Sequence, residues 1–159
     1  MSYPRFRPSE EFSEQATAVF REHEGWIRER LPDAEIRHRG GTSVPGVLTS
    51  GDVDVHVRVP EGSFESARRE LAALYEPFHR DAWSPGESAF FLAPDSRPLV
   101  EIALTAIGSL DDLHHGEAWD RIASDRELIE QYNELKRRCE NASPAEYNVA
   151  KRAFFYDNF

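Results

Sequence analysis

The sequence predicts a small α+β protein with a cluster of carboxylates on one face of its strands. Two patterns lead to this class. Stretches near both ends of the chain repeat apolar residues at intervals of three and four, as amphipathic helices do. Between them, shorter stretches alternate apolar and polar residues, as half-buried strands do. The chain has 159 residues, about the length of one domain, and contains no repeat or linker. We therefore expect one domain over residues 1–159.

Composition fits a globular protein and limits its partners. Hydrophobic residues make up 40% of the chain and charged residues 30%, which is enough apolar material for a core. The 29 acidic and 19 basic residues give a formal net charge of −10. This balance argues against a broad nucleic-acid-binding face, because phosphate backbones are held by clustered Lys and Arg. It still permits one nucleotide or one RNA end held through a metal ion.

Cysteine content and hydropathy predict a cytoplasmic protein without membrane contact. Cys139 is the single cysteine, so the sequence supports neither an intramolecular disulfide nor a Cys-based zinc cluster. This residue continues an apolar helical stripe and is expected to be inert. The N-terminus has no apolar signal region, and no apolar run approaches the length of a membrane span.

Several stretches have the periodicity of helices. Ser9 is the expected N-cap of the first, because acidic residues that suit the positive end of the helix dipole follow it. Ser143 begins the last, with Pro at the first helical position and Glu at the third, a capping box. The expected helices cover residues 10–31, 63–75, 116–123, 125–138 and 144 onward.

Other stretches have the alternation of strands. The clearest carries four valines on one face and Asp52, Asp54, His56 and Arg58 on the other. The last two strands flank a proline-rich turn and are expected to pair as a hairpin. The expected strands cover residues 34–39, 52–59, 88–92 and 99–104. Residues 89–92 have the character of an exposed sheet edge, which favours a homodimer.

Asp52, Asp54 and Glu101 form a candidate metal site. Residues two apart on a strand point to the same side, roughly 6.5–7 Å apart, so both aspartates can reach cations lying against the sheet. Glu101 stands alone among apolar residues of another strand, where a carboxylate is costly unless it has a partner. Two Mg²⁺ ions roughly 3.5–4 Å apart can clamp the attacking and leaving oxygens of a phosphoryl transfer. Mg²⁺ prefers such hard oxygen ligands, so we expect these three acids to bind it.

The same residues have a simpler interpretation. A D-x-D pattern on an alternating strand is often just a solvated face, and Glu101 can also be paired with Arg58 or His56. The loop over residues 40–43, which precedes the acids, favours the metal site. Its glycine N–H groups and its hydroxyls can bind a phosphate without side-chain obstruction, and a phosphate loop beside a carboxylate strand makes a coherent site.

The loop and the strand after it resemble the GrpB family of the nucleotidyltransferase superfamily. The matching segments are residues 38–47 (HRGGTSVPGV) and 51–55 (GDVDV). The resemblance covers residues 4–155 and includes the C-terminal helices, and the Thr-Ser-Val-Pro-Gly block is its most specific part. GrpB-like domains occur alone or fused to dephospho-coenzyme A kinase.

The resemblance implies a fold and an activity. The fold would be a nucleotidyltransferase-like, mixed and strongly twisted sheet, with helices packed on one face, the acidic site on the other and further C-terminal helices. The activity would be Mg²⁺-dependent transfer of a nucleoside monophosphate from a nucleoside triphosphate. Gly40 and Gly41 would hold the triphosphate, Asp52 and Asp54 would bind metal, and Glu101 would be the third acid. Asp52 stands where typical members have an apolar residue, which brings this chain closer to the catalytic pattern of the superfamily.

Thr42, Ser43 and Lys151 complete the nucleotide site that the resemblance implies. Gly41 stands where many members carry Ser, so Thr42 or Ser43 would supply the missing hydroxyl contact. Lys151 and Lys136 lie on helices that the family pattern retains. Each would either meet a phosphate as a point charge or lie on a solvated helix face.

Four further residues have weaker functional interpretations. His56 shares the acidic face and is expected to support the metal ligands rather than to bind metal. His114 and His115 are adjacent, so their side chains diverge, and we expect a loop or helix cap there. Trp83 lies in a loop-like stretch, where it is half-buried or free to stack on a base.

Three functions stay open on the sequence. The leading one is a nucleotidyltransferase whose acceptor is a small hydroxyl or amine compound, a protein hydroxyl or an RNA 3′ end. The second is a non-catalytic nucleotide- or coenzyme-binding module, because the acidic chain offers few cations near the loop. The third is a metal-dependent phosphohydrolase, since the same carboxylate clamp can activate water.

Overall fold

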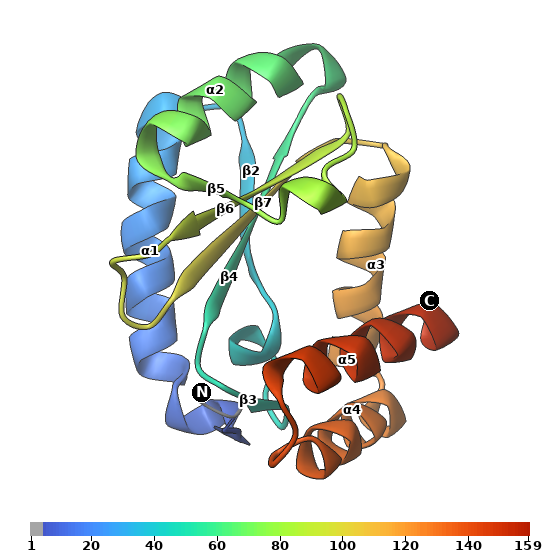
Figure 1. Cartoon of the computed structure of the whole chain (residues 1–159). Helices are drawn as coiled ribbons and strands as arrows, with labels where there is room; N and C mark the ends of the chain where they lie inside the picture. Colours follow the sequence, from blue (N-terminus) through green and yellow to red (C-terminus); the bar gives the residue numbers. More distant parts are fainter. Residues whose placement is uncertain (1–4) are drawn as a thin grey trace.

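Five strands form a mixed sheet at the centre of the structure, a computed structural model that describes residues 5–159 (Figure 1). The strand order is β2-β4-β7-β6-β5. β4 and β7 run parallel, and every other neighbouring pair is antiparallel. The mixed sheet is therefore confirmed, as is the β6–β7 hairpin. The strands are β2 (Glu35–Arg39), β4 (Val53–Val59), β5 (Glu76–Phe78), β6 (Ser88–Ala93) and β7 (Val100–Ala106).

Five α-helices surround the sheet, and two short strands form a separate ribbon. β1 (Arg7–Pro8) pairs with β3 (Leu48–Thr49). Single 3₁₀ turns lie at Ser9–Glu11, Gly41–Ser43, Glu61–Ser63 and Arg80–Ala82. Within residues 5–159, no helix has the length and apolar character that crossing a bilayer requires. The helices are α1 (Ser13–Arg30), α2 (Phe64–Leu74), α3 (Leu110–Ser124), α4 (Arg126–Arg138) and α5 (Pro144–Asn158).

α1, on the left of Figure 1, and α2, across the top, cover the apolar face of the sheet. The four valines of β4 are buried there, as the alternation predicts. They pack with Ile27 of α1 and with Phe64 and Leu71 of α2 in one apolar cluster. Burying such side chains contributes roughly 1.5–3 kcal/mol each, so this face supplies the main core.

The C-terminal helices lie on the other side of the sheet, on the right of Figure 1. α3, α4 and α5 share a second apolar cluster around Tyr132, which also contains Val44 and Val47 from the segment after the glycine loop. This cluster fastens the loop to the C-terminal helices. α3 also contacts the polar face of the sheet directly, so helices cover part of both faces.

The pairing register places the acids side by side. Asp54 of β4 is the register partner of Glu101 in the parallel strand β7 and of Arg39 in the antiparallel strand β2. Neighbouring strands are separated by roughly 4.8 Å, and register partners point to the same face. Two residues further along, His56 pairs with Ala103. The sheet therefore presents Asp54 and Glu101 as immediate neighbours on the face away from α1 and α2.

Three local predictions are wrong. Ser9 does not cap α1: its hydroxyl donates to the Val44 carbonyl at 2.7 Å, and α1 begins at Ser13 without a side-chain cap. α3 begins at Leu110 with Ser109 as its N-cap, six residues earlier than expected. His114 and His115 consequently lie inside a helix rather than in a loop. The strong cap and the docking of the first turn onto the sheet explain the longer helix.

β6 is not an edge strand, which removes the argument for a homodimer drawn from it. The short strand β5, which the sequence analysis missed, pairs with β6 through residues 76–78. Ala89 and Phe91 of β6 are buried. A three-residue strand containing Pro77 has too little alternation to be recognised from its own sequence.

Candidate active site

Asp54 and Glu101 form a tightly coupled pair of half-buried carboxyls. Burial and the neighbouring charge of Glu101 raise the pKa of Asp54 to about 8, and Asp52 adds to the rise while Lys151 opposes it. A hydrogen bond between the two carboxyl groups contributes in the same direction. Like charges at this separation cannot both ionise freely. The pair therefore holds a proton at neutral pH, and a bound cation would take the place of that proton.

Asp52 lies immediately before β4 and is also half-buried. Burial, followed by the charge of Glu101, raises the pKa of Asp52, and Lys151 and Lys136 oppose this rise. The structure thus brings the three predicted acids into one electrostatic cluster. The alternative in which Glu101 pairs with Arg58 or His56 is wrong, because Arg58 binds Asp112 and Glu35, as described below.

Asp54 and Glu101 open into a cleft of about 270 Å³, which we call the acid cleft. Lys151 lines it beside them, together with aromatic rings that include Phe90, Trp119 and Phe155. Asp52 and the glycine loop border the carboxylate cluster but are not among the lining residues of the acid cleft. The sequence analysis did not anticipate the aromatic walls, because they come from four elements distant in the chain.

At Gly40 the backbone of the glycine loop packs directly against the Asp54 side chain. Its φ of 75° lies in the left-handed region that favours glycine. A Cβ built on Gly40 would lie 1.9 Å from Asp54 Oδ2, so only glycine allows the backbone this approach. Gly41 has a different neighbour, since a Cβ there would lie 2.9 Å from the Thr49 side chain. A serine at that position therefore requires Thr49 to move.

The hydroxyls of Thr42 and Ser43 hold the loop itself together. Thr42 Oγ1 donates to the carbonyl of Asp52 at 3.0 Å and accepts from His38 Nε2 at 2.8 Å, because a hydroxyl has one proton to donate. Ser43 Oγ donates to the carbonyl of Gly40 at 2.6 Å. These bonds tie the loop to the start of β4. For either hydroxyl to donate to a phosphate, it must first give up the hydrogen bond that it donates within the protein.

α4 grips the segment that follows the loop through Asn133 and Lys136. Asn133 accepts from the Leu48 N–H at 2.7 Å and donates to the Gly46 carbonyl at 2.8 Å. Lys136 Nζ donates to the Leu48 carbonyl. We call these three bonds the α4 clamp. Sequence reasoning missed Asn133, whose only signal is a polar residue beside the apolar stripe of an amphipathic helix.

Lys136 is buried, not solvated. Its Nζ lies 4.2 Å from the Tyr132 ring centroid. Burial and then the charge of Lys151 lower the pKa of Lys136 to about 7, although Asp54 and Asp52 oppose the shift. Lys151 is half-buried and lies in the acid cleft itself. Lys151 is therefore the lysine placed to meet a ligand there, and Lys136 acts within the clamp.

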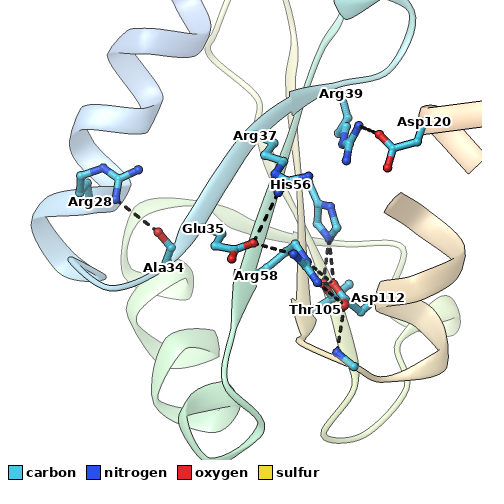
Figure 2. Close-up of polar contacts among 11 residues, drawn as sticks. Arg28, Ala34, Glu35, Arg37, Arg39, His56, Arg58, Thr105, Asp112 and Asp120 are labelled. Carbon is cyan, nitrogen blue, oxygen red and sulfur yellow. Dashed lines mark hydrogen bonds and ion pairs between the residues drawn. The ribbon is translucent and has the colours of Figure 1, made fainter. Parts of the chain in front are cut away.

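Asp112 anchors α3 to the polar face of the sheet (Figure 2). Its carboxylate accepts from Arg58 Nε at 2.7 Å, from Thr105 Oγ1 at 2.8 Å and from the Gly108 N–H at 3.0 Å. Burial opposes ionisation of Asp112, but hydrogen bonds led by that from Arg58 outweigh it and lower its pKa. Arg58 also binds Glu35 of β2. This network fixes the helix that carries Trp119 into the acid cleft.

His56 belongs to the α3 anchor rather than to the carboxylate cluster. It is fully buried, and its Nε2 lies 2.8 Å from Thr105 Oγ1. The Thr105 hydroxyl uses its one hydrogen in the bond that it donates to Asp112, so it can only accept from His56. Nε2 is therefore the protonated nitrogen. Burial and then the nearby His115 ring lower the pKa of His56 to about 2, so the ring is neutral. Its Nδ1 is buried without a partner among the described residues.

The remaining candidates lie away from the acid cleft. Trp83 packs against the cluster beneath α2 and donates from Nε1 to the Phe78 carbonyl at 2.9 Å. The base-stacking role is therefore not supported by its position, whereas its half-buried state agrees with the simpler prediction. Cys139 is half-buried against the C-terminal cluster, as expected from the apolar stripe.

Replacing Gly40 with Ala is expected to destabilise the protein by about 1–2 kcal/mol, since a side chain at positive φ is strained. The new Cβ also has to displace the Asp54 carboxyl. Thermal unfolding measures the first effect, and NMR titration of the Asp54 carboxyl measures the second. Gly25→Ala is the matched control, because Gly25 lies in α1 with no atom near its Cβ position. That variant should gain about 0.5–1 kcal/mol. An unchanged Asp54 titration in Gly40→Ala would contradict the contact.

Replacing Asn133 with Ala is expected to cost about 2–3 kcal/mol, because two backbone groups of the loop segment lose their partners. Hydrogen exchange of the Leu48 amide should accelerate accordingly. The exposed residue Gln131 in the same helix supplies a control, and Gln131→Ala should stay within about 0.5 kcal/mol of wild type. Equal stability of the two variants would show that the α4 clamp contributes nothing.

The architecture defines a fold class, which comparison with known structures identifies. The fold is that of the nucleotidyltransferases. Cid1, described as having RNA terminal uridylyl transferase activity, superposes with a TM-score of 0.52 at 13% identity, covering 78% of this chain and 40% of Cid1. At this identity the likeness establishes the fold alone.

The chain belongs to the GrpB family. Residues 9–158 match the family described as "GrpB protein". A UPF0157 protein of Vibrio cholerae is 31% identical over 150 residues, which cover 94% of this chain and 79% of the relative. The crystal structure of the conserved protein GrpB from Enterococcus faecalis superposes with a TM-score of 0.66 at 16% identity, covering 89% of this chain and 93% of that one. The family resemblance seen in the sequence is thus confirmed.

Proposed function

We propose that this protein is a Mg²⁺-dependent nucleotidyltransferase that acts as a single domain over residues 1–159. The observation that carries the proposal is the pairing of Asp54 with Glu101 on neighbouring parallel strands, with Gly40 closed against Asp54. This pairing puts two carboxylates and a backbone loop at one point. Cid1, which shares the fold, has a structure with MgGTP bound, at a TM-score of 0.50.

The chemistry of the donor set fits Mg²⁺. Asp52, Asp54 and Glu101 offer hard oxygen ligands whose mutual repulsion is unbalanced. Among residues 5–159, the side chains in their present positions form no group of three or more His, Cys, Asp or Glu ready to hold an ion. Mg²⁺ commonly uses one or two carboxylates and completes its shell with waters and substrate phosphates. Asp54 and Glu101 would turn from each other toward the ion when the nucleotide arrives.

The remaining groups have distinct tasks in this reaction. When bound, Mg²⁺ would neutralise phosphate charge and align the attacking and leaving oxygens. Backbone N–H groups of Gly40 and Gly41, with the hydroxyls of Thr42 and Ser43, hold the triphosphate. Lys151, which lines the acid cleft, binds the phosphates as a point charge.

The transfer step is a displacement at the α-phosphorus. The acceptor hydroxyl or amine gives its proton to Glu101, and its oxygen or nitrogen forms a bond to the α-phosphorus. The bond from that phosphorus to the oxygen bridging to the β-phosphate breaks, and its electron pair leaves with pyrophosphate beside Lys151. The reaction needs no oxidant or further reactant.

Calorimetry with Mg²⁺ and each of the four nucleoside triphosphates tests the proposal, combined with an assay for pyrophosphate. Binding that requires Mg²⁺ and is lost in Glu101→Gln is the expected result. A nucleotide that binds tightly but is never consumed would instead identify a binding module. Phosphate release that needs no acceptor would identify a phosphohydrolase. No binding of any triphosphate would remove the enzyme proposal.

A further inference from the structure

Three cavities meet at the rings of Phe90 and Phe155. The acid cleft is the first. The second, about 370 Å³ in volume, is lined by Lys151 and Arg152 of α5, and we call it the lysine cavity. The third, about 520 Å³ in volume, lies between α3 and the Ser88 end of β6, and we call it the serine cavity. Phe90 and Phe155 line all three, so the three cavities are neighbours.

The two outer cavities differ in the charge of the residues that line them. Lys151 and Arg152 make the lysine cavity cationic, and no acid stands among the described residues that line it. The serine cavity has the opposite character. Asp111 is the one Asp or Glu among its described lining residues, and none of these is Lys or Arg. A nucleoside triphosphate with several negative charges therefore belongs on the lysine side, and a phosphate chain would be repelled from the serine side.

The serine cavity combines apolar walls with a polar corner at Ser88 and Asp111. Thr105, His114 and His115 add further polar groups to its lining. Trp119, Phe155 and Phe159 are among its aromatic lining residues. In the corner, Ser88 Oγ donates to Asp111 Oδ2 at 2.6 Å, which holds the carboxylate in position. A volume of about 520 Å³ lies in the range of small-molecule sites, which combine apolar walls with a few polar groups.

The sheet register sets the distance between this corner and the reacting centre. Ser88 is the register partner of Thr105, and Leu92 is the register partner of Glu101. Four residues along a strand span roughly 13 Å. A small molecule can therefore reach from Asp111 to the acid cleft, with its body against Trp119.

We propose that the serine cavity is the acceptor site and that it takes a small aromatic molecule carrying an ammonium group. This inference rests on the proposed nucleotidyl transfer. The ammonium binds Asp111, the ring packs against the wall that Trp119 and Phe155 form together, and the far hydroxyl or amine reaches the acid cleft. An RNA 3′ end does not fit, because its phosphates would enter a cavity whose charged lining residue is an aspartate.

Binding of tyramine tests the site directly. Tyramine carries an aromatic ring, a hydroxyl and an ammonium, and 3-(4-hydroxyphenyl)propionate is a close analogue with a carboxylate in place of the ammonium. NMR of the Trp119 indole N–H should report tyramine binding at least about tenfold tighter than the analogue, because the carboxylate meets Asp111. Asp111→Asn should remove this preference. Glu127→Gln is the matched control, since Glu127 occupies the first turn of α4, and it should retain the preference.

Two further measurements separate this proposal from the proposed function. Mg²⁺-ATP should bind wild type and Asp111→Asn equally, and a twelve-nucleotide RNA should not stimulate pyrophosphate release. Equal affinity for tyramine and its carboxylate analogue, or RNA-stimulated release that survives Asp111→Asn, would overturn the acceptor site alone. If no triphosphate binds the wild type, the nucleotidyl-transfer proposal fails, and the acceptor assignment fails with it even where tyramine binds.

Discussion

Replacing Asp54 with Asn should stabilise the metal-free protein while abolishing the proposed transfer. The gain in stability at pH 8 should be about 1–3 kcal/mol, because the folded variant no longer has to hold a proton that the unfolded wild type releases from Asp54. Activity should fall by at least about 10³-fold, since an ion-binding carboxylate supports several kcal/mol of transition-state stabilisation. A single substitution therefore has opposite effects on stability and on function.

The pH dependence of this gain follows from the raised pKa of Asp54. The folded protein holds the Asp54 proton up to about pH 8, whereas the unfolded chain releases it near the ordinary aspartate value. Between those values the folded state binds more protons, so wild type loses stability as pH rises. The advantage of Asp54→Asn should therefore grow from pH 4 to pH 8 and then level off.

Thermal unfolding with and without Mg²⁺ measures these effects. Mg²⁺ should raise the unfolding temperature of wild type and leave that of Asp54→Asn unchanged. Asp33→Asn, at an exposed aspartate in the turn between α1 and β2, is the control and should behave as wild type. A stability advantage that is flat with pH would mean that Asp54 is not held protonated by its neighbours.

Replacing Asp112 with Asn should cost about 3–5 kcal/mol, because Arg58 loses its buried counter-ion and keeps only Glu35, whose side chain is 50% exposed. Asp112 is fully buried and Arg58 is 20% exposed, so water replaces little of the lost interaction. For a chain of this length the loss corresponds to a fall of roughly 10 °C in Tm. Because α3 carries Trp119, the acid cleft should loosen as well.

The second anchor of α3 supplies a matched control. Arg39 binds Asp120 at 2.7 Å, but the Asp120 side chain is 64% exposed. The Arg39 side chain is 12% exposed, so Asp120→Asn should cost more than the loss of a fully exposed pair but less than Asp112→Asn. Equal losses in the two variants would mean that burial does not set the strength of the anchor. The double variant Arg58→Met with Asp112→Leu should recover only part of the lost stability. An apolar pair can replace a buried ion pair, but the Thr105 hydroxyl and the Gly108 N–H lose their acceptor.

Local patterns in the sequence were sufficient for most elements of the fold. Alternation along β4 separates the valines from Asp54, and that separation needs only the twofold period of a strand. Ser143 caps α5 and accepts from the Glu146 N–H at 3.1 Å, as the capping box predicts. Residue type also marked Glu101, because an acid in an apolar strand needs a partner, whereas the approach of Gly40 to Asp54 was not predicted.

Contacts between distant segments decided the rest. Parallel pairing of β4 with β7 makes Asp54 the neighbour of Glu101, β5 turns β6 into an interior strand, and Asn133 reaches the loop from α4. None of these follows from local period or cap, because each depends on which surfaces pack together across long stretches of chain. Short-range steric effects and hydrogen bonds act between residues close in the chain, so helix periods, strand alternation and capping residues can be recognised in the sequence. Strand neighbours and buried polar partners result from the packing of the whole chain, and so only the tertiary structure shows them.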